Sequence, residues 1–119
     1  MLLQIALPDV ESQDELQRVL DFLADECERQ VRKHRLPHPF LSGARYKREP
    51  VPRERWQTAL ETLQRGEADC EDLSAYLCGW LRAHGTPARA VLRPSSLGYH
   101  AIVESQGQTI DPSRYLGMK

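Results

Sequence analysis

The sequence predicts an α+β domain, with helices in the first part of the chain and a small antiparallel sheet in the last part. Apolar residues recur at helical spacing over residues 13–33 and again over residues 70–84. Beyond residue 87 the apolar residues fall at every second position, which is typical of strands. A chain of 119 residues is long enough for one hydrophobic core, so we expect a single domain over residues 1–119.

The first predicted helix covers residues 13–33 and follows a short strand at residues 2–7. Ser12 and Glu15 match a capping box at its start, and basic residues gather near its end, as the helix dipole favours. Cys27 lies on the apolar face of this helix, where we expect it to join the core.

A second helix is predicted from Pro52 to Arg65, because proline suits the first helical position and Gly66 provides a stop. Between these two helices, residues 35–52 contain four prolines and Gly43, which predicts a loop. A loop of this length either folds over the functional end of the domain and shapes a groove, or packs on its outside as a stiff connector.

The third predicted helix begins at Asp69 or Cys70 and ends at His84, with Gly85 directly after it. Few polar residues follow its first turn, so we expect a buried central helix that packs on the antiparallel sheet. Cys78 lies in the interior of this helix and is expected to pack in the core.

The sheet is predicted from three strands, Ala88–Leu92, Tyr99–Glu104 and Gln108–Asp111. A two-residue turn between the last two strands would pair Ser105 with Gln108 and place Ile102 opposite Asp111. His100 would then be the diagonal cross-strand neighbour of Asp111, at a Cα separation of roughly 7–8 Å.

The composition excludes several classes of protein. The formal net charge of −1 argues against a nucleic-acid-binding protein that depends on overall positive charge. No apolar run approaches the roughly 20 residues that a membrane helix requires. The three cysteines lack CxxC spacing, which favours free thiols in a reducing compartment over disulfides or a metal site. We therefore expect a cytoplasmic protein with no nucleic-acid or membrane partner.

The charges are unevenly distributed along the chain. Residues 1–28 hold eight acids and one base, a net charge of −7, whereas residues 29–55 hold nine bases and two acids, a net charge of +7. Two interpretations remain open. The segments form solvated surfaces with charges matched to each other or to a helix dipole, or the second forms a basic patch for a polyanion or an acidic partner.

Cys70 is the candidate nucleophile, because it falls at the start of a buried helix. Free N–H groups and the dipole there favour a thiolate, and the N–H of Cys70 itself could serve an oxyanion hole. Asp69, Glu71 and Asp72 act in the opposite direction, since nearby carboxylates raise the pKa of a thiol, although two of them could instead provide a helix cap and a supporting contact. We predict that the thiolate nevertheless forms near neutral pH.

His100 and Asp111 complete a possible triad. The Asp111 carboxylate would accept a hydrogen bond from one imidazole nitrogen of His100, while the other nitrogen would face the thiol. We expect the sulfur of Cys70 to lie within about 4 Å of a nitrogen of His100. A metal site formed by the same three side chains is a less favoured alternative, and we predict no metal.

Four segments carry a family resemblance: residues 66–73 (GEADCEDL), 80–91 (WLRAHGTPARAV), 99–103 (YHAIV) and 110–112 (IDP). Together they resemble the transglutaminase-like branch of the papain-like thiol enzymes. The resemblance implies a papain/transglutaminase-like core, with Cys70 as nucleophile, His100 as general base and acid, and Asp111 as the residue that orients His100.

A narrower resemblance rests on Asp-Cys-Glu-Asp-Leu, on residues 42–50 (SGARYKREP) and on Trp56. These features are similar to short transglutaminase-like proteins encoded by tailed bacteriophages. They imply a location in a bacterial host cell or in the virion, and phage structural proteins as candidate partners.

Two features depart from the family pattern. Ile102 stands where many members carry tryptophan, and the upstream oxyanion donor is not assigned. Gln64 lies six residues before Cys70, the papain-like spacing, but falls near the predicted end of the second helix. Trp56 and Tyr46 are alternative candidates. Tyr46 and Arg45 also suit the binding of a peptide or a carboxylate.

The sequence therefore predicts a thiol-dependent amide or peptide hydrolase or acyl transferase with a Cys-His-Asp triad. Its substrate would be a protein or peptide, and no cofactor is expected. The alternative is a non-catalytic structural or assembly module of a bacteriophage particle that keeps the fold.

Overall fold

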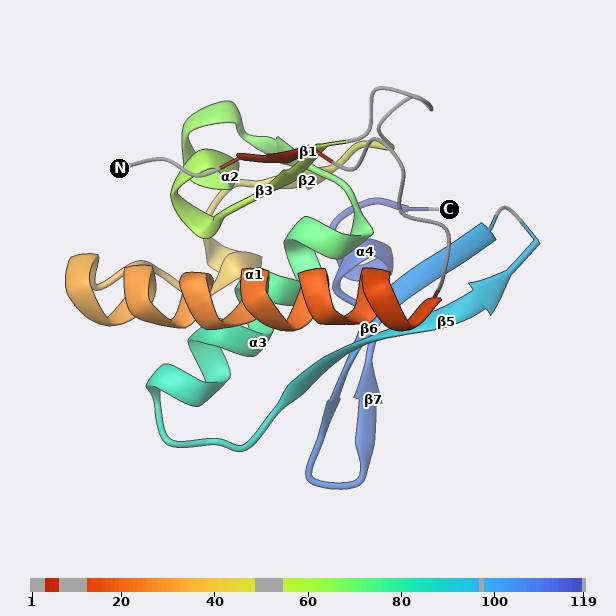
Figure 1. Cartoon of the computed structure of the whole chain (residues 1–119). Helices are drawn as coiled ribbons and strands as arrows, with labels where there is room; N and C mark the ends of the chain where they lie inside the picture. Colours follow the sequence, from red (N-terminus) through yellow and green to blue (C-terminus); the bar gives the residue numbers. More distant parts are fainter. Residues whose placement is uncertain (1–3, 7–12, 49–54, 97, 119) are drawn as a thin grey trace.

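The computed structural model describes residues 4–6, 13–48, 55–96 and 98–118 of the chain (Figure 1). The predicted α+β class is confirmed. The elements in chain order are β1 (Gln4–Ala6), α1 (Gln13–His34), η1 (Pro39–Leu41), β2 (Arg45–Tyr46), β3 (Arg55–Gln57), α2 (Ala59–Arg65), β4 (Glu67–Ala68), α3 (Cys70–Ala83), β5 (Arg89–Ser95), β6 (Gly98–Ser105), β7 (Gln108–Ile110) and α4 (Pro112–Tyr115).

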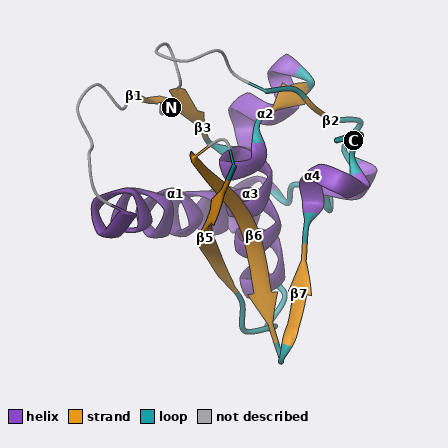
Figure 2. Ribbon diagram, turned by 90° about the vertical axis from the view of Figure 1, so that its right-hand side faces the viewer, coloured by secondary structure: helices purple, strands orange, loops and turns teal. Residues whose placement is uncertain are grey.

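Two long helices and one sheet enclose the core. α1 packs against α3, and the three-stranded antiparallel sheet, in the order β5-β6-β7, lies against these helices (Figure 2). Apolar side chains of α1, α3, β5 and β6 form the main cluster, in which Cys27 and Cys78 have no exposed surface. The prediction that these two cysteines belong to the core is confirmed.

The boundaries of α1 and α3 agree with the sequence prediction. The predicted capping residue Ser12 lies outside the described residues. α3 ends at Ala83, and Gly85 follows its C-cap residue His84 with a φ of 85°, the left-handed conformation that glycine adopts easily. No helix in the described ranges has both the length and the apolar character that crossing a bilayer requires.

α1 and α3 approach closely at Gly79. A Cβ atom added to Gly79 would lie 2.6 Å from the backbone nitrogen of Glu28 and 2.9 Å from the Cβ of Cys27. Glycine at this position therefore allows the close approach of the two helices.

The predicted second helix is wrong over its first part. The described residues 55–57 form β3, which pairs with β1 in antiparallel orientation, and α2 begins only at Ala59. Two interactions explain the later start. The N–H of Gln57 donates to the Asp72 carboxylate at 2.6 Å, and Thr58, with extended backbone, caps α2. The predicted stop at Gly66 is confirmed, with a φ of 73°.

The segment predicted as a loop contains short regular elements in its described part, residues 35–48. η1 forms one 3₁₀ turn, and β2 pairs in parallel with β4. The N–H of Arg45 donates to the carbonyl of Gly66, and the N–H of Lys47 donates to the carbonyl of Ala68. These bonds hold the segment directly beside the residues that precede Cys70.

The hairpin strands are longer than predicted. β5 continues through Pro94 and Ser95 and β6 begins at Gly98, so the predicted loop at residues 94–98 is mostly strand. Proline is tolerated there because β5 lies at the edge of the sheet. The predicted pairing of Ser105 with Gln108 is confirmed, and β7 ends at Ile110, one residue before the prediction.

The outer edge of β5 is covered by side chains of α1. The amide group of Gln17 donates to the carbonyl of Ala90 at 2.9 Å and accepts from the N–H of Leu92 at 2.9 Å. Gln13 donates to the carbonyl of Leu92 at 3.2 Å. These side chains satisfy backbone groups that an edge strand would otherwise leave open for pairing with another chain.

Candidate active site

Cys70 is the first residue of α3, as predicted, and only 5% of its surface is exposed. The helix start is fixed by a capping box, in which the N–H of Asp69 donates to the carboxylate of Asp72 at 3.1 Å and the Asp69 side chain accepts from the first turn of the helix. Asp72, fully buried, also accepts from the N–H of Gln57. The suggestion that two of the neighbouring acids serve as cap and supporting contact is confirmed.

A cavity of about 290 Å³ opens at this end of α3. It is lined by four of the residues singled out from the sequence, Cys70, His100, Tyr46 and Trp56. These come from α3, β6, β2 and β3, so the cavity gathers residues far apart in the chain. The described part of the 35–52 segment thus forms one wall of the cavity, as the first of its two interpretations expected.

His100 and Asp111 form the pair that the strand register predicts. The Nε2 atom of His100 lies 2.8 Å from Oδ2 of Asp111, and the two side chains are 25% and 20% exposed. Asp111 also caps α4 by accepting from the N–H of Arg114, and the Arg114 guanidinium lies 3.5 Å from Oδ2. Because Nε2 is engaged by the carboxylate, Nδ1 is the imidazole nitrogen left for other chemistry.

The backbone N–H of Ala101 is placed to hydrogen-bond the sulfur of Cys70, a contact that only partly opposes the larger effects of burial, Glu71 and Asp69, which raise the pKa of the thiol. Ala101 follows His100 on β6, so this contact places the thiol beside the strand that carries the imidazole. The bond is a backbone feature, which no pattern of side chains in the sequence could have indicated.

The net effect of the surroundings on the pKa of Cys70 differs from the prediction. Burial raises the pKa of the thiol most strongly, and the carboxylates of Glu71 and Asp69 raise it further, well above its ordinary value. The two carboxylates and the sulfur lie within 4.8 Å of one another, and all three residues are buried. The prediction of a thiolate near neutral pH is not supported, because the combined effect favours the neutral thiol.

Among the described residues, Asp69, Cys70 and Glu71 place their ligand atoms close enough to share one cation. Asp69 Oδ1 already accepts from the N–H of Cys70 at 2.7 Å. The sequence analysis, by contrast, predicted no metal site.

The oxyanion donors also differ from the expectation. The N–H of Cys70, expected to be free for an oxyanion, donates to Asp69. Burial, followed by the charges of Asp69 and Cys70, raises the pKa of the Tyr46 hydroxyl to about 12. The hydroxyl therefore stays protonated at physiological pH and is available as a donor at the cavity that Cys70 also lines. Trp56 is 2% exposed and forms another wall.

Two of the candidates from the sequence lie elsewhere. Gln64 is exposed near the end of α2 and Arg45 is exposed on β2, and neither lines the cavity. Arg48, which sequence reasoning did not single out, does line it. The alternation of side chains along an extended segment could have indicated Arg48, because it lies two residues after Tyr46.

Comparison with protein families gives a match. The family model of the transglutaminase-like superfamily matches residues 9–112, which is most of the chain. The chain belongs to the transglutaminase-like superfamily. Neither the curated proteins nor the solved structures contain a match.

Membership in the transglutaminase-like superfamily indicates the general class of chemistry, that of thiol-dependent hydrolases and acyltransferases. The matched range includes Cys70, His100 and Asp111, so the residues of the candidate site belong to the family domain and not to an addition outside it.

Proposed function

We propose that this chain is a thiol-dependent hydrolase or acyl transferase that acts on amide bonds in a peptide or protein. Cys70 is the nucleophile, His100 is the general base and acid, and Asp111 orients His100. The observation that carries this proposal is the bond between His100 and Asp111 at a cavity that Cys70 also lines. The contact within about 4 Å between the Cys70 sulfur and a His100 nitrogen remains a prediction.

The reaction needs only these side chains and the substrate. Nδ1 of His100 takes the thiol proton as the sulfur of Cys70 bonds to the amide carbonyl carbon. The carbon–nitrogen bond then breaks, and the imidazolium returns its proton to the leaving amine, which leaves a thioester on Cys70. Water or a second amine attacks the thioester, gives up a proton through His100, and releases the acyl product with the thiol restored.

The raised pKa of Cys70 affects how this step proceeds. A thiol held neutral by burial, Glu71 and Asp69 must lose its proton as it attacks, because little thiolate exists beforehand. The reaction then depends strongly on the imidazole of His100, since general base catalysis contributes roughly 10²–10⁴-fold.

The cavity walls support a peptide or protein substrate. Leu16, Trp56 and Leu92 provide apolar surface, and Arg48 provides a cation at the same cavity. The protonated hydroxyl of Tyr46 is the favoured oxyanion donor, because the N–H of Cys70 is engaged by Asp69. No cofactor or metal takes part in this scheme.

A second candidate function is a non-catalytic assembly module, with structural proteins of a tailed phage as partners, in the host cytoplasm or the virion. The observation that favours it is the state of Cys70, which is 5% exposed, has its N–H engaged and has a raised pKa. A chain of this kind would keep its partner binding when Cys70 is replaced by serine.

Amide turnover separates the two functions. Fluorescently labelled casein, with and without an added fluorescent primary amine, reports hydrolysis and acyl transfer. We expect Cys70→Ser to abolish turnover, and His100→Ala and Asp111→Asn to lower it by about 10²-fold or more. Cys78→Ser is the matched control, because Cys78 lies on the same helix but does not line the cavity. Turnover that survives Cys70→Ser would contradict the proposal.

A further inference from the structure

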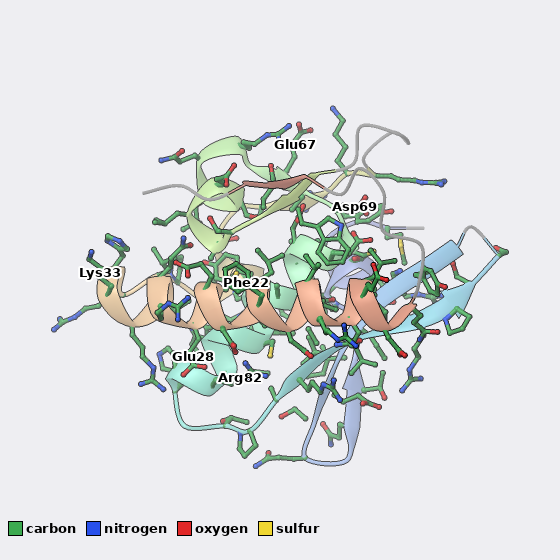
Figure 3. All side chains as sticks on the ribbon, viewed as in Figure 1. Phe22, Glu28, Lys33, Glu67, Asp69 and Arg82 are labelled. Carbon is green, nitrogen blue, oxygen red and sulfur yellow. The ribbon has the colours of Figure 1, made fainter. Side chains whose placement is uncertain are left out.

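A second cavity lies where α1 and α3 end. Its volume is about 470 Å³, and it shares no lining residue with the cavity at Cys70. In Figure 3, Lys33 marks this end of α1, whereas Asp69 lies toward the other end of the helix. The cavity has an apolar part and a basic part, formed by Val31, Leu36, Ala83, Arg32, Arg35 and His84.

Arg35 has a backbone conformation that arginine rarely adopts. It follows α1 directly, with a φ of 52°, and the N–H of Leu36 donates to the carbonyl of Val31. This pattern is a Schellman motif with Arg35 at the position that usually carries glycine. A non-glycine residue kept at a backbone position where glycine is favoured suggests that the chain uses its guanidinium for something other than folding.

The guanidinium of Arg35 is available to a ligand. It has no ion pair or hydrogen bond among the residues that the structure describes. Arg32, by contrast, is held in place by Glu28 and by the carbonyl of Arg82. Nδ1 of His84 bonds to the carbonyl of Trp80, and the two rings stack at 3.9 Å, so the imidazole is fixed with Nε2 free of that bond.

The helix ends do not repel an anion strongly here. The last carbonyls of a helix carry partial negative charge when they lack partners. At this cavity several of them already accept hydrogen bonds, including those of Val31, Leu81 and Arg82. The positive charge of Arg35 therefore meets little opposing charge, because Glu28 is already paired with Arg32.

We propose that this cavity binds an acidic peptide segment of a partner protein. A carboxylate of the segment pairs with the Arg35 guanidinium, and an adjacent apolar side chain packs on the partly exposed Leu36 and Ala83. The size fits one or two side chains and not a folded surface. The site is independent of the thiol chemistry, so the Cys70→Ser variant binds the peptide segment with the same affinity as the unchanged chain.

Fluorescence anisotropy with a labelled peptide of alternating glutamate and leucine tests this proposal. We expect Arg35→Gly to weaken binding about tenfold or more and to raise the thermal midpoint by about 3 °C, because glycine relieves the strain. Arg35→Gln weakens binding without that rise, since it removes the charge and keeps the strain. Gln106→Gly is the matched control, because Gln106 also has a positive φ, 51°, and does not line this cavity. The Gln106→Gly change raises the thermal midpoint and leaves peptide binding unchanged.

Three results would overturn the proposal. The first is equal binding of a peptide with glutamine in place of glutamate, which would remove the role of the carboxylate. The second is unchanged binding by Arg35→Gly. The third is displacement of the peptide by a DNA or RNA oligomer at equal charge concentration, which would identify the ligand as nucleic acid.

Discussion

Among single residues, Cys70 and its immediate neighbours determine how the candidate site works. Helix position alone would favour a thiolate, but burial and two adjacent carboxylates have the larger effect and keep the thiol neutral. Asp69 also engages the N–H that an oxyanion would use. The same acidic residue therefore fixes the start of α3 and limits the reactivity of the thiol that the helix presents.

Replacing Glu71 by glutamine should make Cys70 more reactive. Glu71 is the carboxylate with the largest effect on the thiol, and two negative charges repel, so removing one lowers the pKa of Cys70. The midpoint of the alkylation rate against pH should move to lower pH. Glu67→Gln is the matched control, because Glu67 is exposed and does not line the cavity. A midpoint that stays or rises would contradict this explanation of the raised pKa.

Tyr46→Phe should separate oxyanion stabilisation from thiol reactivity. Loss of one oxyanion donor costs about 10²–10³-fold in turnover, whereas alkylation by iodoacetamide forms no oxyanion. We expect amide turnover to fall and the alkylation rate of Cys70 to stay the same. Phenylalanine is the appropriate replacement, because the Tyr46 ring packs against both core clusters and alanine would also destabilise the fold. An equal fall in both rates would instead indicate a general disturbance of the cavity.

At the scale of elements, the positions of α3 and β6 bring the thiol and the imidazole to one cavity. Local patterns predicted α1, α3, the stop at Gly66 and the register that pairs His100 with Asp111. The parallel pair of β2 and β4 was missed, because residues 45–46 and 67–68 are far apart and too short to show a pattern. β3 was missed because the bond between Gln57 and Asp72 depends on tertiary structure.

Gly79→Ala tests the close contact of α1 and α3. In an isolated helix this change stabilises by about 1 kcal/mol, because alanine has the higher helix propensity. Here the new Cβ would lie 2.6 Å from a backbone atom of α1, so we expect a loss of about 1–3 kcal/mol. Urea unfolding measures the sign directly. Stabilisation would show that the helices are not in close contact at Gly79.

Gln17→Ala tests the cover on the edge of β5. The change leaves the N–H of Leu92 and the carbonyl of Ala90 without their side-chain partner, which should cost about 1–3 kcal/mol in the free energy of unfolding. Gln13→Ala is the comparison, since its side chain makes one bond to the same strand and should cost less. Equal effects of the two variants would show that Gln17 is not the main cover of this edge.

At the scale of the whole molecule, ion pairs within α1 and between elements balance part of the uneven charge of the sequence. Arg29 and Arg32 pair with Glu26 and Glu28 one turn earlier. Asp25 pairs with Arg82 of α3, and Asp21 pairs with Arg89 of β5. The interpretation of charges matched between the two segments is therefore confirmed for the pairs of Arg29 and Arg32. Arg35, like Lys33, Arg45 and Arg48, has no such partner among the described residues.

The central claim is that Cys70 and His100 form one reactive unit. Competitive alkylation with iodoacetamide, read for each cysteine by peptide mass spectrometry, tests it most directly, with Cys27 and Cys78 as fully buried internal controls. Cys70 should react at least about tenfold faster than either, and His100→Ala should remove most of that advantage. A Cys70 that reacts as slowly as Cys27 and Cys78, or at a rate that His100→Ala does not change, would contradict the account.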